Sequence, residues 1–262
     1  MIDLHCHLLP EIDDGSTSLA ESLEMARLAV ADRISVVACT PHILPGVYNN
    51  KGPGIRAAVA RLQGELDREG IPLVLSAGAD VHLAPDLLEG LKSGEILSLA
   101  DSRYFLLEPP AAIVPPRFED HLFNLAAAGR VPVVTHPERL SWPEGDYGIF
   151  ERLVRHGAWM QVTGGSLLGQ FGRRARALAE RMLDDGLVHI LASDAHDTKN
   201  RPPILSDAFA AAASRIGEDE ALHLVSTRPA GILKNVDPSE LPPPVRIEPV
   251  RGGRGRAWAQ RN

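Results

Sequence analysis

Met1-Ile2-Asp3-Leu4-His5-Cys6-His7 opens the chain, and this stretch has the pattern of a short buried strand that ends in two histidines. Because side chains alternate across a strand, His5 and His7 are expected on one side, and Cys6 is expected to pack on the other. Two imidazoles on one side of a strand end suit a metal ion. The competing interpretation is an edge strand with two solvated histidines, and the H-x-H pattern alone does not decide between them.

The bulk composition is that of an ordinary globular protein. With 262 residues, 44% of them hydrophobic and 23% charged, the chain can bury one large core. No apolar run reaches the roughly 18 residues that would indicate a membrane span, and the N-terminus lacks the pattern of a removable signal. Two cysteines, Cys6 and Cys39, form no disulfide framework, so a cytoplasmic location is expected. The net charge of −7 argues against general nucleic-acid binding.

The C-terminal end differs in composition from the rest. Pro242–Asn262 contains five arginines, one glutamate and the run Arg-Gly-Gly-Arg-Gly-Arg, which is typical of a disordered extension. We therefore expect a single domain over residues 1–235 and a Pro/Arg/Gly-rich tail over residues 236–262 that is disordered and solvated. Contact of this tail with anionic lipid or an acidic partner is the alternative.

Apolar β-type runs alternate with helical stretches along the chain. The expected strands are Ile2–His5, Ser35–Thr40, Leu73–Ala77, Tyr104–Leu107, Val131–Thr135, Trp159–Val162 and Val188–Ala192. The expected helices are Ser18–Asp32, which begins with the capping box Ser18/Glu21, and Ile55–Glu69, Arg117–Ala128, Tyr147–Arg155, Arg173–Asp185 and Ile204–Ser214. Buried strands that alternate with helices predict an α/β fold with a parallel sheet. About seven such units predict a distorted (β/α)7 TIM-like barrel; an open doubly wound sheet is the alternative.

Polar side chains follow these strands at their carboxyl ends. Each expected strand except Trp159–Val162 leads into a histidine, aspartate or glutamate, and these residues are His5, His7, His42, Asp80, Glu108, His136, Asp194 and His196. In a barrel of parallel strands the carboxyl ends share one face, so these side chains are expected to converge there. Imidazoles and carboxylates without thiolates suit Mn²⁺, Fe²⁺ or Zn²⁺ and are typical of multinuclear hydrolytic sites.

Five further histidines lie elsewhere in the sequence. We interpret four histidines as structural or surface residues: His121, His156, His189 and His223. His82 follows Asp80 at a strand end, and its role stays open. Neither cysteine is followed six residues later by the arginine of a cysteine-based phosphatase loop, because those positions hold Ile12 and Pro45. The chain also lacks a G-x-S-x-G nucleophile elbow and a P-loop.

Several motifs together resemble one family. They are M-I-D-L-H-C-H at 1–7, D-D-G at 13–15, T-P-H at 40–42, G-A-D at 78–80, D-S-R-Y at 101–104, Glu108, H-P-E-R at 136–139, L-V-H-I-L-A-S-D-A-H at 187–196 and R-P-P at 201–203. The chain resembles the PHP (polymerase and histidinol phosphatase) superfamily. Within it, the chain is most similar to the bacterial manganese-dependent protein-tyrosine phosphatases of capsule and exopolysaccharide operons.

The resemblance implies a centre of up to three divalent ions, with Mn²⁺ expected and Fe, Zn or Mg possible. One metal would be surrounded by His5, His7, Glu108 and Asp194. A second would be held by Asp80, Glu108 and His136, and a third by Asp14, His42 and His196. The family usually has glutamate where this chain has Asp80. Because aspartate is one methylene shorter, the second metal is expected to bind more weakly or through water.

The resemblance also implies an activity. Arg139 and Arg201 match the family's phosphate-contacting arginines, and Asp194 is implied to be catalytic as well as a ligand. The expected reaction is hydrolysis of phosphotyrosine by metal-activated hydroxide, on a tyrosine-phosphorylated bacterial kinase or its tail that controls capsule or exopolysaccharide synthesis. An alternative role for the two arginines is an ion pair with Glu138 and Asp197. Alternative functions are a histidinol-phosphate or other small-molecule phosphomonoesterase, and a non-catalytic metal-holding binding module.

Overall fold

The computed structural model describes residues 1–142 and 145–247. Its strands are β1 (Ile2–Cys6), β2 (Val36–Cys39), β3 (His42–Ile43), β4 (Val74–Ala77), β5 (Asp80–His82), β6 (Tyr104–Glu108), β7 (Val131–Thr135), β8 (Trp159–Thr163) and β9 (Ile190–Ala192). Every pairing between these strands is parallel. The expected α/β architecture with a parallel sheet is therefore confirmed.

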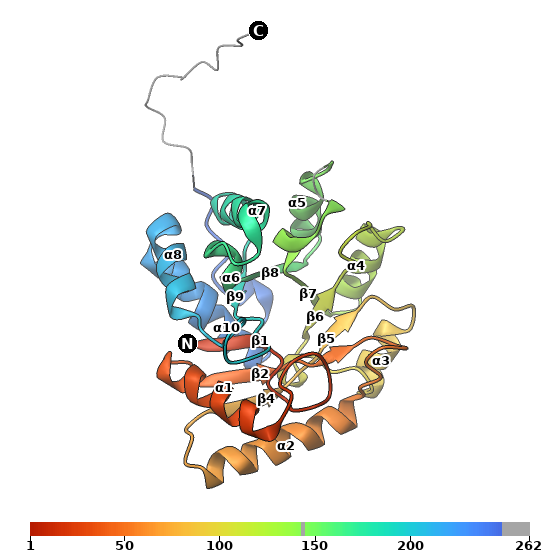
Figure 1. Ribbon diagram of the computed structural model, residues 1–262. Helices are drawn as coiled ribbons and strands as arrows, with labels where there is room; N and C mark the ends of the chain where they lie inside the picture. Colours follow the sequence, from red (N-terminus) through yellow and green to blue (C-terminus); the bar gives the residue numbers. More distant parts are fainter. Residues whose placement is uncertain (143–144, 248–262) are drawn as a thin grey trace.

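Helices lie around the outside of the strands (Figure 1). The longer ones are α1 (Leu19–Ala31), α2 (Gly52–Arg68), α4 (Phe118–Ala127), α5 (Gly148–Arg155), α7 (Gly172–Asp184) and α8 (Ser206–Ile216). Shorter ones that the sequence did not predict are α3 (Leu87–Ser93), α6 (Gly164–Leu167), α9 (Glu218–Leu222) and α10 (Arg228–Leu233). His223 begins a π-helical turn, His223–Thr227, between α9 and α10.

The strands form two sheets, ordered β1-β2-β4 and β3-β5-β6-β7-β8-β9. The strands expected over Ser35–Thr40 and Leu73–Ala77 correspond to β2 and β4, and each is followed after two residues by a short strand that was not expected, β3 or β5. Beyond β9, a single parallel bridge joins Ala195 to Cys6, the last residue of β1. The edges of the two sheets thus meet beside β1, while closure into a complete barrel stays a prediction.

Alternate residues of the strands contribute to two separate apolar clusters. We call the smaller one the inner cluster; it comprises Leu4, Ala38, Leu99, Tyr104, Leu106, Val131, Val133, Trp159, Ile190 and Ile232. Phe105 and Leu107 of β6 instead join the larger cluster, which lies between the strands and the helices. Two residues beyond Leu106 on the same strand face, Glu108 follows at the carboxyl end. The apolar interior thus occupies one end of the strands, and the polar groups begin at the other.

A register irregularity in β1 directs the two N-terminal histidines. Asp3 pairs with Val37, whereas Cys6 pairs with Cys39, so β1 holds one extra residue over this interval. Leu4 belongs to the inner cluster, whereas Cys6 belongs to the larger cluster. In a regular strand, residues two apart would share one face. Such a bulge re-aims the side chains that follow it. Cys6 accordingly packs away from His5 and His7, as expected.

The capping box expected at the start of α1 is only half formed. Ser18 caps the helix, because its side chain accepts a hydrogen bond from the Glu21 amide at 3.2 Å. The Glu21 carboxylate does not return to Ser18, as a capping box requires, but accepts from the amide and the hydroxyl of Thr17 at 2.8 and 2.7 Å.

The C-terminal segment follows the body of the protein as far as it is described. The hydroxyl of Tyr104 donates to the carbonyl of Val236 at 2.9 Å, and the amide of Ile247 donates to the carbonyl of Asp184 at 2.8 Å. The expected domain boundary at residue 235 remains a prediction. Most of the expected tail, residues 248–262, lies outside the described residues.

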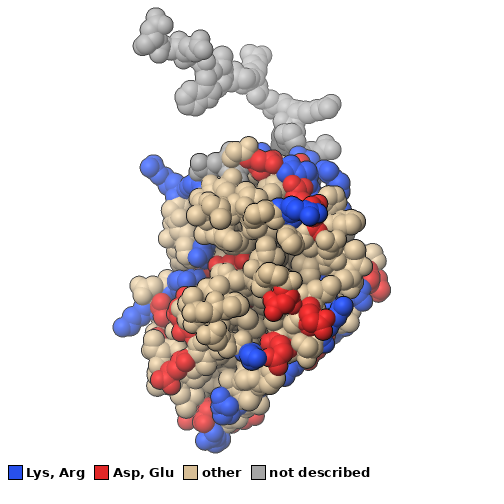
Figure 2. All heavy atoms as spheres, turned by 90° about the vertical axis from the view of Figure 1, so that its right-hand side faces the viewer, with Lys and Arg blue, Asp and Glu red and all other residues tan. Residues whose placement is uncertain are grey.

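Charge on the surface is mixed where it can be seen. Basic and acidic side chains are interspersed on the face in Figure 2, over a mainly uncharged surface. This face therefore offers no basic patch of the kind that nucleic-acid binding needs. Within residues 1–142 and 145–247, no helix combines the length and the hydropathy that crossing a membrane requires.

Removing the buried arginine of α10 should destabilise the fold. Arg228 is fully buried, pairs with both oxygens of Glu220 at 2.7 and 3.0 Å, and donates to the carbonyl of Pro242 at 2.7 Å. Arg228→Ala leaves the Glu220 carboxylate without its partner and should lower the free energy of unfolding by about 3 kcal/mol. Urea denaturation measures this. Arg246→Ala, which removes an exposed ion pair with Asp185, is the control and should change it by less than about 1 kcal/mol.

Candidate metal centre

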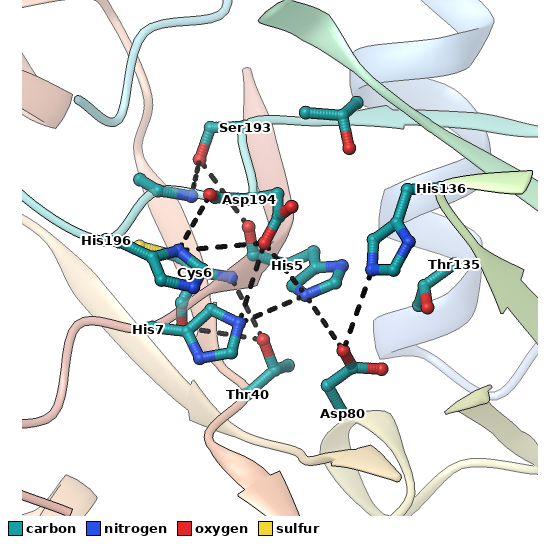
Figure 3. Close-up of polar contacts among 12 residues, drawn as sticks. His5, Cys6, His7, Thr40, Asp80, Thr135, His136, Ser193, Asp194 and His196 are labelled. Carbon is teal, nitrogen blue, oxygen red and sulfur yellow. Dashed lines mark hydrogen bonds and ion pairs between the residues drawn. The ribbon is translucent and has the colours of Figure 1, made fainter. Parts of the chain in front are cut away.

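The nine residues predicted as metal ligands lie together at the carboxyl ends of the strands. Six of them, His5, His7, Asp80, His136, Asp194 and His196, are shown in Figure 3. His5 lies in β1 and His7 directly follows it, while His42, Asp80 and Glu108 lie in β3, β5 and β6. His136 directly follows β7, Asp194 and His196 lie two and four residues beyond β9, and Asp14 lies in the loop after β1. The interpretation of His5 and His7 as solvated edge histidines is wrong, because both are fully buried.

These residues form overlapping groups whose ligand atoms lie within 4.8 Å of one another. The groups are His7/Asp14/His42/His196, His5/His7/Asp80, His5/His136/Asp194 and Asp80/Glu108/His136. Two of them contain the sets that the resemblance implied for the second and third metals. The first set differs: Asp80, rather than Glu108, lies beside His5, with Oδ2 at 3.4 Å from Nε2 of His5. The ligand roles themselves stay predictions.

Hydrogen bonds at Nδ1 of each ring orient His5 and His7. Nδ1 of His7 bonds to the Asp13 carboxylate at 2.7 Å, and Nδ1 of His5 bonds to Oε1 of Gln161 at 2.9 Å. Both rings therefore present Nε2 to the centre, where the two Nε2 atoms approach to 3.3 Å. Carboxylate and amide partners of this kind fix the ring orientation of metal-ligating histidines.

Several buried polar atoms of the group have no hydrogen-bond partner within the described residues. They are both oxygens of Asp80, Oε2 of Glu108 and Nδ1 of His42. Because a buried carboxylate without a partner is costly, such atoms call for a ligand. Carboxylate and imidazole donors in this number suit divalent cations, so the residues present fit the expected metals.

The backbone is strained at two of the predicted ligands. His136 has φ of 36° and Asp194 has φ of 53°, both in the left-handed region that side chains other than glycine rarely adopt. His136 directly follows β7, and Asp194 lies two residues beyond the end of β9. Strain of this kind persists where surrounding structure enforces it and often accompanies a functional site.

Charge in the metal-free centre is balanced by protons. Burial disfavours a charged imidazole at His7, but Asp13 and Asp194 outweigh it and raise the pKa of His7 to about 10. Despite its burial, Asp194 keeps a pKa well below the usual range because of the imidazoles around it. Burial, together with the nearby Arg139, lowers the pKa of His136 to about 4. At neutral pH the metal-free site thus holds a proton on His7.

Both predicted phosphate-binding arginines reach this centre. The guanidiniums of Arg139 and Arg201 each donate to Oδ2 of Asp194. Both also lie over the ring of Phe171, with their central carbons 4.4 and 5.6 Å from its centroid, a cation–π arrangement. Among the described residues, the alternative partners do not pair with the guanidiniums: the Glu138 carboxylate accepts from Ser166, and the Asp197 carboxylate accepts from the backbone amides of Lys199, Asn200 and Arg201.

Sequence reasoning missed some residues of the site. Gln161 is a fully buried amide in β8, the one expected strand without a terminal ligand, and its polarity within an apolar run was an available clue. Asp13 stood in the quoted D-D-G motif, but its contact with His7 was not predicted. No feature of the sequence pointed to Phe171. His82, left open, lies 2.7 Å from Glu108.

Comparisons with known proteins identify relatives of this chain. A family model described as "Capsular polysaccharide synthesis, CpsB/CapC" matches residues 1–234. Tyrosine-protein phosphatase YwqE of Bacillus subtilis (strain 168) is 39% identical over 201 residues, which cover 77% of this chain and 79% of that protein. Tyrosine-protein phosphatase CpsB of Streptococcus agalactiae is 27% identical over 240 residues, which cover 90% of this chain and 99% of that protein.

A solved structure is also similar over nearly the whole chain. It comes from crystal structures of YwqE from Bacillus subtilis and CpsB from Streptococcus pneumoniae, described as unique metal-dependent tyrosine phosphatases. The TM-score is 0.86 at 35% identity, and the match covers 94% of this chain and 100% of that chain. The predicted resemblance is therefore confirmed.

Asp13→Asn should weaken metal binding. The substitution keeps the size of the side chain but removes the negative charge behind His7, so the affinity for metal should fall by about 10- to 100-fold. Elemental analysis after gel filtration and titration with Mn²⁺ measure this. Asp120→Asn, at an exposed ion pair with Arg117, is the matched control. Equal metal binding by both variants would contradict a role for Asp13 in orienting His7.

Metal binding should release protons and tighten with rising pH. The metal-free protein holds a proton on His7 up to about pH 10, and a metal ion must displace it from Nε2. Because the proton is present only in the metal-free state, the affinity should rise by about tenfold per pH unit for each proton released. Calorimetric titrations in buffers of different ionisation enthalpy count these protons. Affinity that is constant through the neutral range would count against this assignment.

Proposed function

The chain belongs to the CpsB/CapC family of capsular polysaccharide synthesis, and we propose that it hydrolyses phosphotyrosine in proteins at the metal centre described above. Its relatives YwqE and CpsB are tyrosine-protein phosphatases, and the crystallised ones are metal-dependent. The proposed ligands are His5, His7, Asp14, His42, Asp80, Glu108, His136, Asp194 and His196.

The observation that carries the proposal is the position of the two arginines. Arg139 and Arg201 converge on one oxygen of Asp194, whose other oxygen lies 3.3 and 3.6 Å from Nε2 of His5 and His7. Two guanidiniums beside a cluster of metal-binding groups form a receptor for a tetrahedral dianion, because each guanidinium offers a planar pair of donors. A metal centre that only stores or senses metal has no need of them.

The metals and the two arginines would have different roles in the reaction. When bound, divalent metals supply a nucleophile at neutral pH by lowering the pKa of water, and they neutralise phosphate oxygens. Arg139 and Arg201 would leave Asp194 for the phosphate and stabilise charge on its equatorial oxygens. The Phe171 ring holds both guanidiniums in place through cation–π contacts. A tyrosine phenolate, whose conjugate acid has a pKa of about 10, leaves without full protonation, so no general acid is assigned.

A cleft beside the centre offers room for residues next to a phosphotyrosine. It has a volume of about 420 Å³, and its lining includes Tyr48 and His82. The Tyr48 ring stacks on that of His42 with 5.6 Å between centroids, which brings the cleft to the edge of the metal centre. We propose that residues flanking the phosphotyrosine occupy it.

The metal and the substrate are proposed in more detail. Imidazole and carboxylate donors without thiolates support Mn²⁺, in up to three positions, with Fe, Zn or Mg as substitutes. We propose that the substrate is a tyrosine-phosphorylated bacterial kinase, or its tail, that controls capsule or exopolysaccharide synthesis. The free thiols of Cys6 and Cys39 support a cytoplasmic location.

One assay tests the substrate class. The purified protein, supplied with Mn²⁺, is given a phosphotyrosine peptide and, separately, histidinol phosphate. Preferred turnover of the peptide supports the proposal. Preferred turnover of histidinol phosphate would make the protein a small-molecule phosphomonoesterase, and metal binding without turnover of either would make it a binding module.

Removing either arginine should impair turnover without loss of metal. Arg139→Ala and Arg201→Ala should each lower kcat for a phenyl phosphate by about 100-fold, because a donor to the developing charge is lost. Arg139→Lys should recover part of this, since lysine keeps the charge but not the planar fork. Arg176→Ala, at an exposed ion pair with Glu180, is the control. Wild-type kcat in either alanine variant would show that the arginine does not bind phosphate.

A further inference from the structure

We propose that His82 is a metal ligand that, with Glu108 and His42, holds a cation at the rim of the centre. These three residues stand outside the ligand groups that contain His5 and Asp194, and their donor atoms lie within 4.8 Å of one another. The inference rests on the proposed metal centre but not on the phosphatase reaction.

The strand geometry brings these three side chains together. His82 is opposite Glu108 in the pairing of β5 with β6, and His42 is opposite Asp80 in the pairing of β3 with β5. Since Asp80 and His82 are two residues apart on β5, their side chains leave the same face. Asp80 and His82 on β5 thus have the same spacing as His5 and His7 at the end of β1.

The distances fit donors that share one ion. Nε2 of His82 lies 2.7 Å from Oε2 of Glu108, and Nδ1 of His42 lies 3.4 Å from the same oxygen. Ligands bound at about 2.1 Å and at right angles on one metal stand about 3 Å apart, close to these spacings. The rings of His42 and His82 are 5.4 Å apart between centroids, with 47° between their planes.

Unpartnered atoms point to the same place. Despite the 2.7 Å approach of His82, the contact with Oε2 of Glu108 lacks hydrogen-bond geometry, and among the described residues neither this oxygen nor Nδ1 of His42 has a hydrogen bond. Next to them is Asp80, fully buried, with both oxygens unpartnered and Oδ2 at 3.6 Å from Nδ1 of His42. A cation between His42, His82 and Glu108 would satisfy Nδ1 of His42 and Oε2 of Glu108.

Glu108 would join this position to the deeper centre. Its other oxygen, Oε1, lies 3.7 Å from Nε2 of His136, so the two carboxylate oxygens face different groups. His82 is 22% exposed, whereas Asp80 is 0% exposed. Since His82 also lines the 420 Å³ cleft, the rim cation would be open to solvent and would exchange most readily.

The competing role for His82 is a hydrogen bond that merely orients Glu108. His82→Gln separates the two roles, because the glutamine amide can still donate to a carboxylate but is a poor metal ligand. His82→Ala removes both functions. His121→Gln changes an exposed histidine in α4 and is the matched control.

The experiment measures Mn²⁺ binding by the purified protein through calorimetric titration and elemental analysis, with circular dichroism as the check on folding. His82→Gln and His82→Ala should both lose one bound Mn²⁺, or bind the weakest Mn²⁺ at least tenfold less tightly, while His121→Gln matches the wild type. Wild-type binding by both His82 variants, or loss in His82→Ala alone, would overturn the assignment. A wild-type protein that binds no metal would instead overturn the whole centre, and one that binds metal without turnover would overturn only the phosphatase proposal.

Discussion

Asp80 and Asp194 approach the same imidazole nitrogen of His5, at 3.4 and 3.3 Å, and this concentration of buried charge constrains the whole molecule. Carboxylates in a low-dielectric interior have to be compensated by protons, guanidiniums or metal ions. Without metal, the proton on His7 and the two arginines on Asp194 provide the compensation. The surrounding strands serve to hold these groups close in spite of their mutual repulsion. The apolar inner cluster, toward the other end of the strands, excludes water from that side of the centre.

Asp194 links the two halves of the proposed chemistry. One of its oxygens faces the imidazoles of β1 and the other faces the guanidiniums, so it lies on the boundary between the metal cluster and the phosphate receptor. A cation near the first oxygen would withdraw charge from the second and loosen its hold on the arginines. Binding of metal and release of the guanidiniums toward phosphate are therefore expected to favour each other. One side chain would thus couple the metal centre to the binding of substrate.

The sequence was informative where a local pattern carries a spatial consequence. Alternation placed His5 and His7 on one side, and the alternation of strands with helices predicted that residues as distant as His42 and His196 would meet. The bulge in β1 could not be predicted, because it depends on how that strand pairs with β2. The short strands β3 and β5 were not predicted, because two and three residues are too few to give a sequence pattern. Phe171 was missed because cation–π contacts leave no spacing rule in the sequence.

The left-handed backbone at His136 and Asp194 limits how this site can vary. Glycine and asparagine adopt this conformation most readily, and aspartate and histidine do so less often, but only the latter two supply a charged carboxylate or an imidazole. The residues that the backbone would accept most easily are therefore those that the chemistry cannot use. A substitution at either position therefore loses the ligand or keeps the backbone strain. Glu108 lies in an extended strand, so its backbone accepts more kinds of residue. Related chains that have lost the activity should thus reveal it first as glycine or asparagine at these two turns.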